Sequence, residues 1–333
     1  ADLNTINAKT TGLVTATAVT NITGSAAVIN TLVDNEGDSG DKVNLDNDYT
    51  ATITDTLITA TLLNTLNGNV PGQINAQSVQ TITGFAGDIN TVYTAASNSE
   101  FSNLGDEDIT LSDTTLAATV LNTLNGSTAG TINASSITTL TGTAVQVNTS
   151  YATAEGEISN LGNEIVSLSE SQIAASDLNT LNSNTSGVIN ATDVSTVTGT
   201  VDQLLTAYTA AASNEISNFG DESITITGDT ETTVTKLTTL NTRTTGSIDA
   251  TNLSSVTGST SAITSFLNNE EGTGNAVNLD TDFAATITDT DVAAQALNTL
   301  NANVPGLITA TSVTNITGTA SDIATLMAAE GDS

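Results

Sequence analysis

The sequence predicts an α/β repeat solenoid, in which coils of about 29 residues each supply a short parallel β-strand and a helix. Three observations predict it: a leucine–asparagine motif repeated about every 59 residues, a shorter anchor repeated about every 29, and a composition poor in bulky side chains. An all-β solenoid is the alternative. The predicted array is continuous over residues 1–333, with long units starting near residues 3, 63, 121, 178, 237 and 297.

The motif Leu-Asn-Thr-Leu-Asn sets the long period. It begins at Leu63, Leu121, Leu178 and Leu297, with variants at Leu3 and Leu237. Successive starts are 60, 58, 57, 59 and 60 residues apart, so one long unit has close to 59 residues. A longer period of 234 residues, or four long units, relates the segment starting at Asn44 to the segment starting at Asn278.

A shorter period lies within the long one. A tripeptide of an apolar residue, Thr or Ser, and Gly, Asp or Glu ends at Gly24, Asp55, Gly84, Asp113, Gly142, Glu170, Gly199, Gly228, Gly258, Asp289 and Gly318. These positions are 28 to 31 residues apart. Each long unit is therefore expected to contain two alternating coils.

Each anchor is predicted to end a short strand. Segments such as Thr81-Ile82-Thr83 alternate hydroxyl and aliphatic side chains, which predicts an aliphatic residue facing inward and hydroxyls facing outward. The residues after the anchors have helical spacing, as in 114–124 and 143–151. In the first of these segments, Leu116, Val120, Leu121 and Leu124 would form one apolar helix face.

Two kinds of polar residue are expected to stabilise the coils. The carboxylates of Asp55, Asp113 and Asp289 are predicted to be the N-caps of the helices that follow them. An asparagine recurs at Asn75, Asn133 and Asn190, with Asp249 in the next copy. These residues fit either an inward-facing ladder or ordinary turns.

The composition excludes several classes of function. With 36 acidic and 4 basic side chains, the net charge is -32 at pH 7, which disfavours binding to nucleic acid or anionic lipid. The chain contains no His or Cys, so these residues supply neither a catalytic base or nucleophile nor a metal ligand. No apolar run approaches the length of a membrane span.

The acidic loops are candidate calcium sites. The predicted ligands are Asp34, Glu36, Asp38, Asp41, Asp46, Asp48, Asp280 and Asp282, and weaker clusters contain Asp106, Glu107, Asp108, Glu270 and Glu271. Ca²⁺ takes six to eight oxygen ligands, and this chain offers only oxygen ligands of that kind. A solvated acidic loop is the alternative. So many carboxylates with so few cations repel one another unless salt or divalent ions screen them, which suits a saline exterior.

The rows of threonine on the strands suggest a second function, a binding module for ice or a surface glycan. Thr is also favoured on exposed strands for structural reasons, and about a fifth of this chain is Thr. An enzyme is not expected, because a catalytic constellation is normally unique whereas these segments repeat. No other cofactor is expected.

The segments LNTLNGSTAGTINASSITTLTGTAVQVNTSYA from Leu121 and NLGNEIVSLSESQIAASDLNTLN from Asn160 resemble repeats of the very large secreted surface proteins of marine cyanobacteria and other aquatic bacteria. The resemblance implies an extracellular adhesin, sheath or surface layer, exported without cysteines and often by a type I route. We expect self-association through the ends or faces of the solenoid. The chain starts and ends within a repeat, so we expect it to be part of a longer polypeptide.

Overall fold

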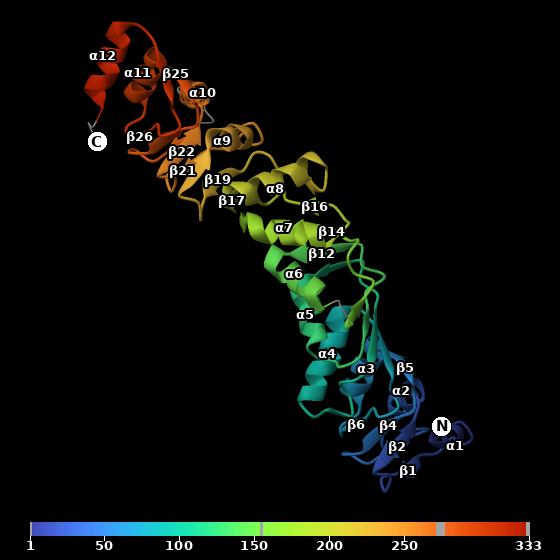
Figure 1. The fold of residues 1–333 in the computed structure, drawn as a ribbon. Coiled ribbons are helices and arrows are strands. Elements are labelled where there is room, and N and C mark those ends of the chain that lie inside the picture. The colour runs from blue at the N-terminus through green and yellow to red at the C-terminus, as the bar shows by residue number, and fades with distance from the viewer. Residues whose placement is uncertain (1, 154–155, 271–276, 331–333) are drawn as a thin grey trace. The chain divides into compact units, whose positions relative to one another are not determined.

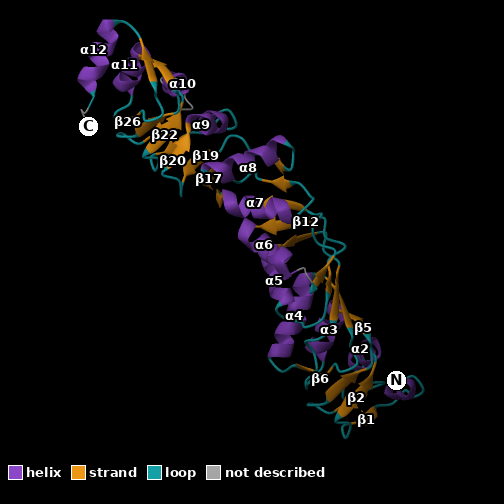
Figure 2. Ribbon diagram, in the orientation of Figure 1, coloured by secondary structure: helices purple, strands orange, loops and turns teal. Residues whose placement is uncertain are grey.

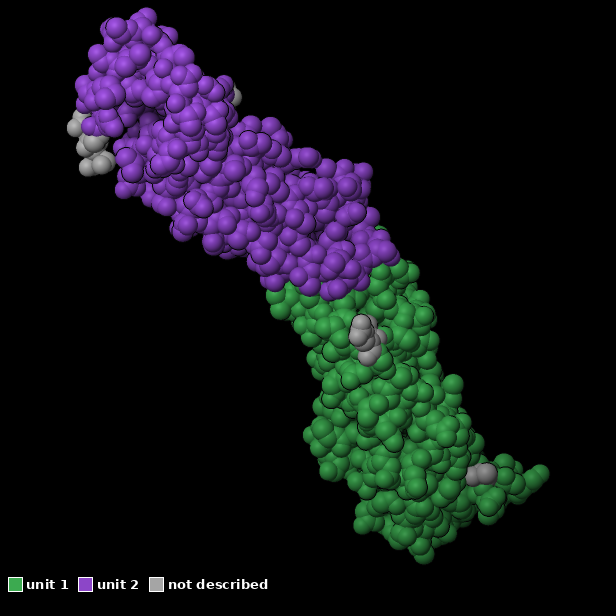
Figure 3. Space-filling view, viewed as in Figure 1, with its two compact units in different colours: residues 1–166 green, residues 167–333 purple. Residues whose placement is uncertain are grey.

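The computed structural model describes residues 2–153, 156–270 and 277–330. It consists of two compact units, Ala1–Val166 and Ser167–Ser333 (Figure 3). Each unit is a succession of short strands and helices of the kind that the sequence predicts (Figure 1). The α/β repeat architecture is therefore confirmed.

The helices are 6 to 12 residues long. In chain order they are α1 (Asp2–Asn7), α2 (Ala26–Asp34), α3 (Ala60–Asn69), α4 (Ala86–Ser97), α5 (Ala118–Asn125), α6 (Ala144–Thr153), α7 (Ala175–Asn184), α8 (Val201–Ala212), α9 (Val234–Asn241), α10 (Thr260–Glu270), α11 (Ala294–Asn303) and α12 (Ala320–Ala329). In Figure 2 the helices of each unit form a row, and the strands lie beside that row.

The strands are two to four residues long. In the first half of the chain they are β1 (Val14–Ala16), β2 (Asn21–Gly24), β3 (Val43–Leu45), β4 (Thr50–Ile53), β5 (Leu57–Thr59), β6 (Ile74–Asn75), β7 (Thr81–Gly84), β8 (Phe101–Ser102), β9 (Asp108–Leu111), β10 (Thr115–Ala117), β11 (Ile132–Asn133), β12 (Thr139–Gly142), β13 (Ile158–Ser159) and β14 (Ile165–Leu168). The remaining strands are β15 (Gln172–Ala174), β16 (Ile189–Asn190), β17 (Thr196–Gly199), β18 (Ile216–Ser217), β19 (Ser223–Ile226), β20 (Glu231–Thr233), β21 (Ile248–Ala250), β22 (Ser255–Gly258), β23 (Val277–Leu279), β24 (Ala284–Ile287), β25 (Asp291–Ala293), β26 (Ile308–Thr309) and β27 (Asn315–Thr317).

The strands of each unit form parallel sheets, and strands that follow one another in the sequence alternate between sheets. In the first unit, one sheet has the order β5-β7-β9-β11-β13 and another has the order β2-β4-β6-β8. In the second unit, the orders β15-β17-β19-β21-β23 and β20-β22-β24-β26 repeat the arrangement. Strands that are neighbours in sequence thus lie in different sheets, and the long unit 63–120 contributes strands to three of them.

The strand register aligns the aliphatic side chains. Ile58 pairs with Ile82, which pairs with Ile109, and the row continues through Ile132 to Ile158. Each of these five side chains is at most 2% exposed. This stacked row is the core of the sheet, and it confirms the predicted inward direction for the aliphatic residues of these strands.

One expected helix begins later than predicted. The segment from Thr114 to Leu124 is not one helix, because Thr115–Ala117 forms strand β10 before helix α5 starts at Ala118. Leu116 therefore lies on a strand, where it pairs with Leu140, and is not part of the helix face. The i, i+4 spacing wrongly placed Leu116 in the helix, because a three-residue strand that runs directly into a helix is too short to change the hydrophobic pattern.

The two leucines of the repeated motif form the buried face of the helices. Leu63 and Leu66 in α3, and Leu121 and Leu124 in α5, are fully buried. The threonine between them is exposed, and its hydroxyl donates to the backbone carbonyl four residues earlier, as Thr65 does to Thr61 at 2.9 Å. A helix face dense in Thr can thus lie in water without unpaired hydroxyl donors. Across the described residues, no helix has the length and apolar character needed to span a membrane.

The stacked aliphatic row should account for much of the stability of a unit. Replacing Ile132 with Ala removes a fully buried side chain that has a strand neighbour on each side. We expect the free energy of unfolding to fall by about 2–5 kcal/mol in chemical denaturation. The control is Ser135→Ala, at an exposed position in the turn that follows the strand. This substitution should change the free energy of unfolding by at most about 0.5 kcal/mol. Equal effects of the two substitutions would contradict the register.

Candidate functional site

The first asparagine of the repeated motif ties one helix to the next. The Nδ2 of Asn64 donates to the carbonyl of Asp88 at 3.0 Å, and the Nδ2 of Asn122 donates to the carbonyl of Gln146 at 3.0 Å. In the second unit, Asn179 donates to Gln203 at 2.9 Å in the same way. Each accepting carbonyl lies in the first turn of the following helix. The motif is therefore a connection between coils as well as a source of buried leucine.

The second asparagine of the motif holds a carboxylate of the next coil. Asn125 donates to Oε2 of Glu157 at 2.7 Å, and Asn182 donates to Oε2 of Glu215 at 2.8 Å. Asn67 and Glu100 make the same bond. A carboxylate that accepts such a bond is fixed without a cation. This pairing of asparagine with glutamate was not evident from the sequence, because the two residues are more than 30 positions apart.

The anchor aspartates were wrongly assigned as N-caps of the helices that follow them. Asp55 accepts from the backbone N–H of Ala26 at 2.8 Å, and Asp113 accepts from that of Ala86 at 2.8 Å. Asp289 accepts from the N–H of Thr260 at 2.6 Å. Each carboxylate therefore lies at the start of the helix in the preceding coil. A carboxylate does stabilise the N-terminus of a helix here, as predicted from the helix dipole, but it is the helix of the preceding coil.

The structure shows a further carboxylate of this kind. Asp229 accepts from the N–H of Val201 at 2.7 Å and so occupies the role of the anchor aspartates, although the anchor itself ends at Gly228. The sequence signal was an Asp displaced by one position from the expected place. A glycine with φ +82° at 228 allows the chain to bring the next residue to the same helix start.

The recurring asparagines are turn residues on the outer side of the sheets. The Oδ1 of Asn75 accepts from the N–H of Gln77, as expected for an asparagine turn. The same oxygen accepts from Nδ2 of Asn103 at 2.9 Å. Asn133 and Asn160 repeat the arrangement at 3.0 Å. Of the two interpretations left open by the sequence, the turn is thus confirmed, and the inward ladder is wrong.

The partner asparagines have a left-handed backbone. The φ angle is +61° at Asn103, +63° at Asn160 and +54° at Asn218. Asn adopts this conformation more readily than other residues with a side chain. The segment Ser-Asn-Leu/Phe-Gly therefore bends sharply, and its asparagine reaches back to the preceding coil.

A glutamate is buried where this bend ends. Glu107 is 1% exposed, and its Oε2 accepts from the hydroxyl of Tyr93 at 3.1 Å and from the N–H of Gly105 at 2.9 Å. Glu222 is equally buried and accepts from Tyr208 at 3.3 Å and Gly220 at 2.8 Å. In both residues the other carboxylate oxygen, Oε1, is buried without a hydrogen-bond partner.

Glu164 and Tyr151 make a third pair of this kind, at 3.2 Å. The buried Glu107 differs from its acidic neighbours in the sequence, because Asp106 and Asp108 are exposed. The predicted cluster of Asp106, Glu107 and Asp108 is thus divided, with its middle member inside the unit.

The following coil closes over each buried glutamate. The hydroxyl of Thr128 donates to the backbone carbonyl of Glu107 at 2.8 Å, and Thr244 does the same to Glu222 at 2.8 Å. A Cβ atom at Gly130 would lie 2.3 Å from that carbonyl oxygen of Glu107. The glycine nine residues after the start of the leucine–asparagine motif is therefore required by close approach of two backbones at Gly72, Gly130, Gly246 and Gly306.

Burial determines the titration of these groups. It raises the pKa of the Glu222 carboxyl, and the neighbouring Asp221 charge adds to the shift, whereas its backbone hydrogen bonds oppose it. Burial also raises the pKa of Tyr208, with a further contribution from the Glu222 charge. Asp108 differs, because hydrogen bonds from the backbone and hydroxyl of Thr131 lower its pKa.

The predicted calcium ligands lie on the surface of the loops. Exposed members are Asp34, Asp38, Asp41, Asp48 and Asp282, and half-buried members are Glu36, Asp46 and Asp280. The Oδ1 atoms of Asp46 and Asp280 accept from the next backbone N–H, at 2.8 and 2.7 Å. Within the described ranges, no group of three or more acidic side chains is arranged to hold a metal ion. Glu271 lies outside the described residues, as does the side chain of Glu270.

The threonine rows on the sheets are short. The longest pairs Thr233, Thr257, Thr286 and Thr309 in register. In the first unit, the row of Thr59, Thr83 and Thr110 continues into Asn133. A glycan or ice surface would therefore meet asparagine turns at short intervals.

The polar side chains of these coils thus hold backbone groups and neighbouring coils together. Tyr, Glu, Asp and Asn each have an assigned structural partner in several copies. Comparison with family models, with curated proteins and with solved structures finds no match for this chain.

The buried glutamate gives the second unit a testable dependence on pH. Because the pKa of Glu222 is raised on folding, its neutral form favours the folded state, and that contribution is lost as pH rises above the ordinary glutamate value of 4.5. Glu222→Gln keeps the acceptor for Tyr208 and Gly220 but removes the charge. We therefore expect the variant to be more stable than the natural chain at pH 7.5 and nearly equal to it at pH 4.5.

The measurement is chemical denaturation at both pH values in 0.5 M salt, which screens the surface charges. Glu231→Gln is the matched control, since Glu231 is exposed and carries the same charge. A pH dependence that is unchanged in Glu222→Gln would contradict the account.

Proposed function

We propose that this chain is a structural protein of the extracellular surface, part of a fibre, sheath, surface layer or adhesin stalk, which self-associates and is stabilised by Ca²⁺. The observation that carries the proposal is the repetition of the same ties between coils. Asparagine–carbonyl, asparagine–glutamate and aspartate–helix bonds recur from one long unit to the next. These bonds hold the successive coils together, which is what a load-carrying element requires.

The charge supports an environment rich in cations. The sequence has 36 acidic side chains, and among the described residues the one ion pair joins Lys236 to Asp202 at 2.7 Å. Repulsion between the remaining carboxylates falls as ionic strength rises. Seawater or another saline medium would supply that screening, and Ca²⁺ at the loops would supply more.

The last described coil carries the apolar side chains that join coils elsewhere in the chain. Ile316, Ile323 and Met327 are 43, 37 and 61% exposed. The corresponding isoleucines of earlier coils, such as Ile82 and Ile89, are fully buried because another coil covers them. Contact between coils therefore uses the same apolar positions from copy to copy.

Electron microscopy of the purified chain tests the structural proposal. In a saline buffer with Ca²⁺ we expect filaments or layers whose repeat is set by stacked coils. Particles that stay dispersed at every ionic strength and calcium concentration would contradict self-assembly.

Calcium stabilisation has its own test. We expect the melting temperature to fall by several degrees when a chelator is added, because ions bound at the acidic loops favour the folded state. The double variant Asp46→Asn/Asp48→Asn should lose part of this shift. The matched control, Asp221→Asn/Glu231→Gln, removes the same charge elsewhere and should keep the shift. A melting temperature that does not respond to chelator would exclude the calcium part of the proposal.

A further inference from the structure

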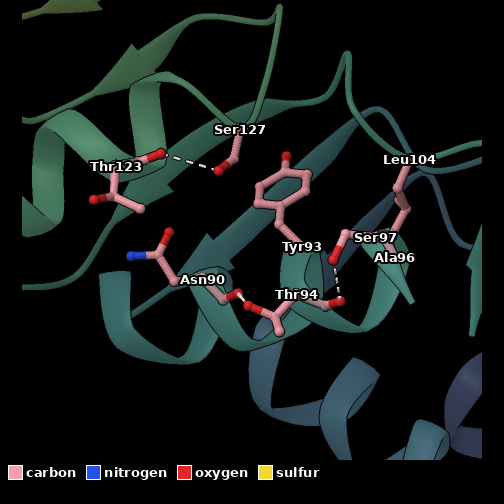
Figure 4. A pocket seen from close by; sticks show the side chains of 8 residues that line it. All are labelled: Asn90, Tyr93, Thr94, Ala96, Ser97, Leu104, Thr123 and Ser127. Carbon is pink, nitrogen blue, oxygen red and sulfur yellow. Dashed lines mark hydrogen bonds between the residues drawn. The ribbon is translucent and has the colours of Figure 1, made fainter. Parts of the chain in front are cut away.

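A hollow lies between helices α4 and α5 of the first unit (Figure 4). Its volume is about 410 Å³. It is lined by Asn90, Tyr93, Thr94, Ala96, Ser97, Leu104, Thr123 and Ser127. Most of these side chains are polar, and none of them carries a charge.

The hydroxyl groups around the hollow have already donated their protons. Thr123 donates to the carbonyl of Thr119 at 2.8 Å, and Ser127 donates to that of Thr123 at 2.9 Å. Ser97 donates to Thr94 at 2.7 Å, and the Tyr93 hydroxyl donates to Glu107. Only lone pairs of these oxygens remain, so the hydroxyls of the lining act as acceptors.

One further acceptor has no partner. The Oδ1 of Asn90 is buried without a hydrogen bond. In Figure 4 this amide oxygen points toward the side of the hollow on which Thr123 and Ser127 lie. A buried acceptor left unpaired destabilises the fold, so a donor in the hollow would stabilise the unit.

The preceding long unit shows how the same position is satisfied from within the chain. Asn69 corresponds to Ser127, because each stands three residues after the second leucine of its motif. By its place in the repeat, Asn30 corresponds to Asn90. There, Nδ2 of Asn69 donates to Oδ1 of Asn30 at 3.3 Å. Ser127 is shorter and directs its proton elsewhere, so the donor is missing and space is left.

In the second unit, different side chains stand at the positions of Asn90 and Ser127. Thr128 and Thr244 make the same bond to a buried glutamate, which makes Arg243 the counterpart of Ser127. Leu205, three residues before Tyr208, is the counterpart of Asn90. The unpaired acceptor is thus replaced by an apolar side chain, and the donor position carries a guanidinium. In both of these other copies, the place of Ser127 holds a nitrogen donor.

The surroundings of the hollow are negative. Burial raises the pKa of Tyr93, a hydrogen bond with Thr128 opposes this, and the charges of Glu107 and Asp106 raise it further. Both carboxylates therefore act on an atom at the wall of the hollow. A positively charged donor is favoured over a neutral one in this field.

From the acceptor-only hydroxyls, the unpaired Asn90 oxygen and the nitrogen donors in the equivalent places, we infer that the hollow between α4 and α5 binds a primary ammonium group. Such a group has three donors and one positive charge, which matches a lining that offers several acceptors and no charge of its own. The lysine side chain of a protein or a free polyamine would supply it. This site is independent of the proposed structural function.

Titration of the full chain with methylammonium, followed by NMR shifts of asparagine side-chain amides, tests the inference. Binding should be saturable, and tetramethylammonium, which has the same charge but no N–H donor, should bind at least tenfold more weakly. Ser127→Asn copies the donor of Asn69, and Asn90→Leu copies Leu205. Either variant should weaken methylammonium binding at least tenfold.

Both variants leave the net charge unchanged, so they are matched for general attraction of cations to this acidic chain, and circular dichroism confirms their folding. Equal binding to the natural chain and to Ser127→Asn, or equal binding of the two cations, would overturn the inference and leave the hollow to water. Spermidine and Nα-acetyl-lysine amide then distinguish the sources: tighter binding of one identifies a polyamine or a lysine side chain.

Discussion

Contact between successive coils is the constraint on which the rest of this structure depends. No coil has side chains large enough to enclose a core, since aromatic residues make up only 3% of the chain. An isoleucine such as Ile82 is buried because strands on both sides pair with its own strand and place Ile58 and Ile109 against it. Stability in such arrays is a sum of nearest-neighbour terms. The two asparagines of the motif follow from this, because each one extends the contact between neighbouring coils.

The same constraint explains how a chain with so few cations folds. Lysine and arginine normally pair with carboxylates, but here backbone N–H groups and amide side chains take their place. Asp113 accepts from the backbone N–H at the start of a helix, and Glu157 accepts from Asn125. Charge-assisted hydrogen bonds of this kind fix a carboxylate without an ion pair. Exposed carboxylates of the acidic loops, such as Asp38 and Asp41, lie in water, and we expect them to account for most of the sensitivity to salt.

Much of the fold could be predicted from the sequence, because periodicity survives in every copy. The parallel strands, the inward aliphatic residues such as Leu140 and the helix α6 followed directly from spacing. The division of consecutive strands between different sheets could not be predicted, because strands of two or three residues such as β11 are too short to show an alternation of apolar and polar residues. The direction of the anchor carboxylates could not be predicted either, since the helix start that Asp55 contacts lies 29 residues earlier in sequence.

The buried glutamates were hidden for a similar reason. Glu107 stands between Asp106 and Asp108, and composition alone groups the three together. Only the sharp bend at Asn103 and the position of Tyr93 on a helix decide that the middle one faces inward. The donor missing beside Asn90 was equally invisible, because it depends on comparing Ser127 with its counterparts at Asn69 and Arg243 in three dimensions.

The most direct test of the account is deletion of residues 63–120, one complete long unit, compared with deletion of residues 84–112, a single coil. If neighbouring coils stabilise one another through alternating contacts, joining Leu62 to Leu121 restores every contact between coils. The shortened chain should then keep the circular dichroism per residue and the cooperative unfolding of the natural chain. Removal of the single coil should lose both, because it places two coils of the same kind side by side. Equal behaviour of the two deletions would contradict the alternation of coils on which the account depends.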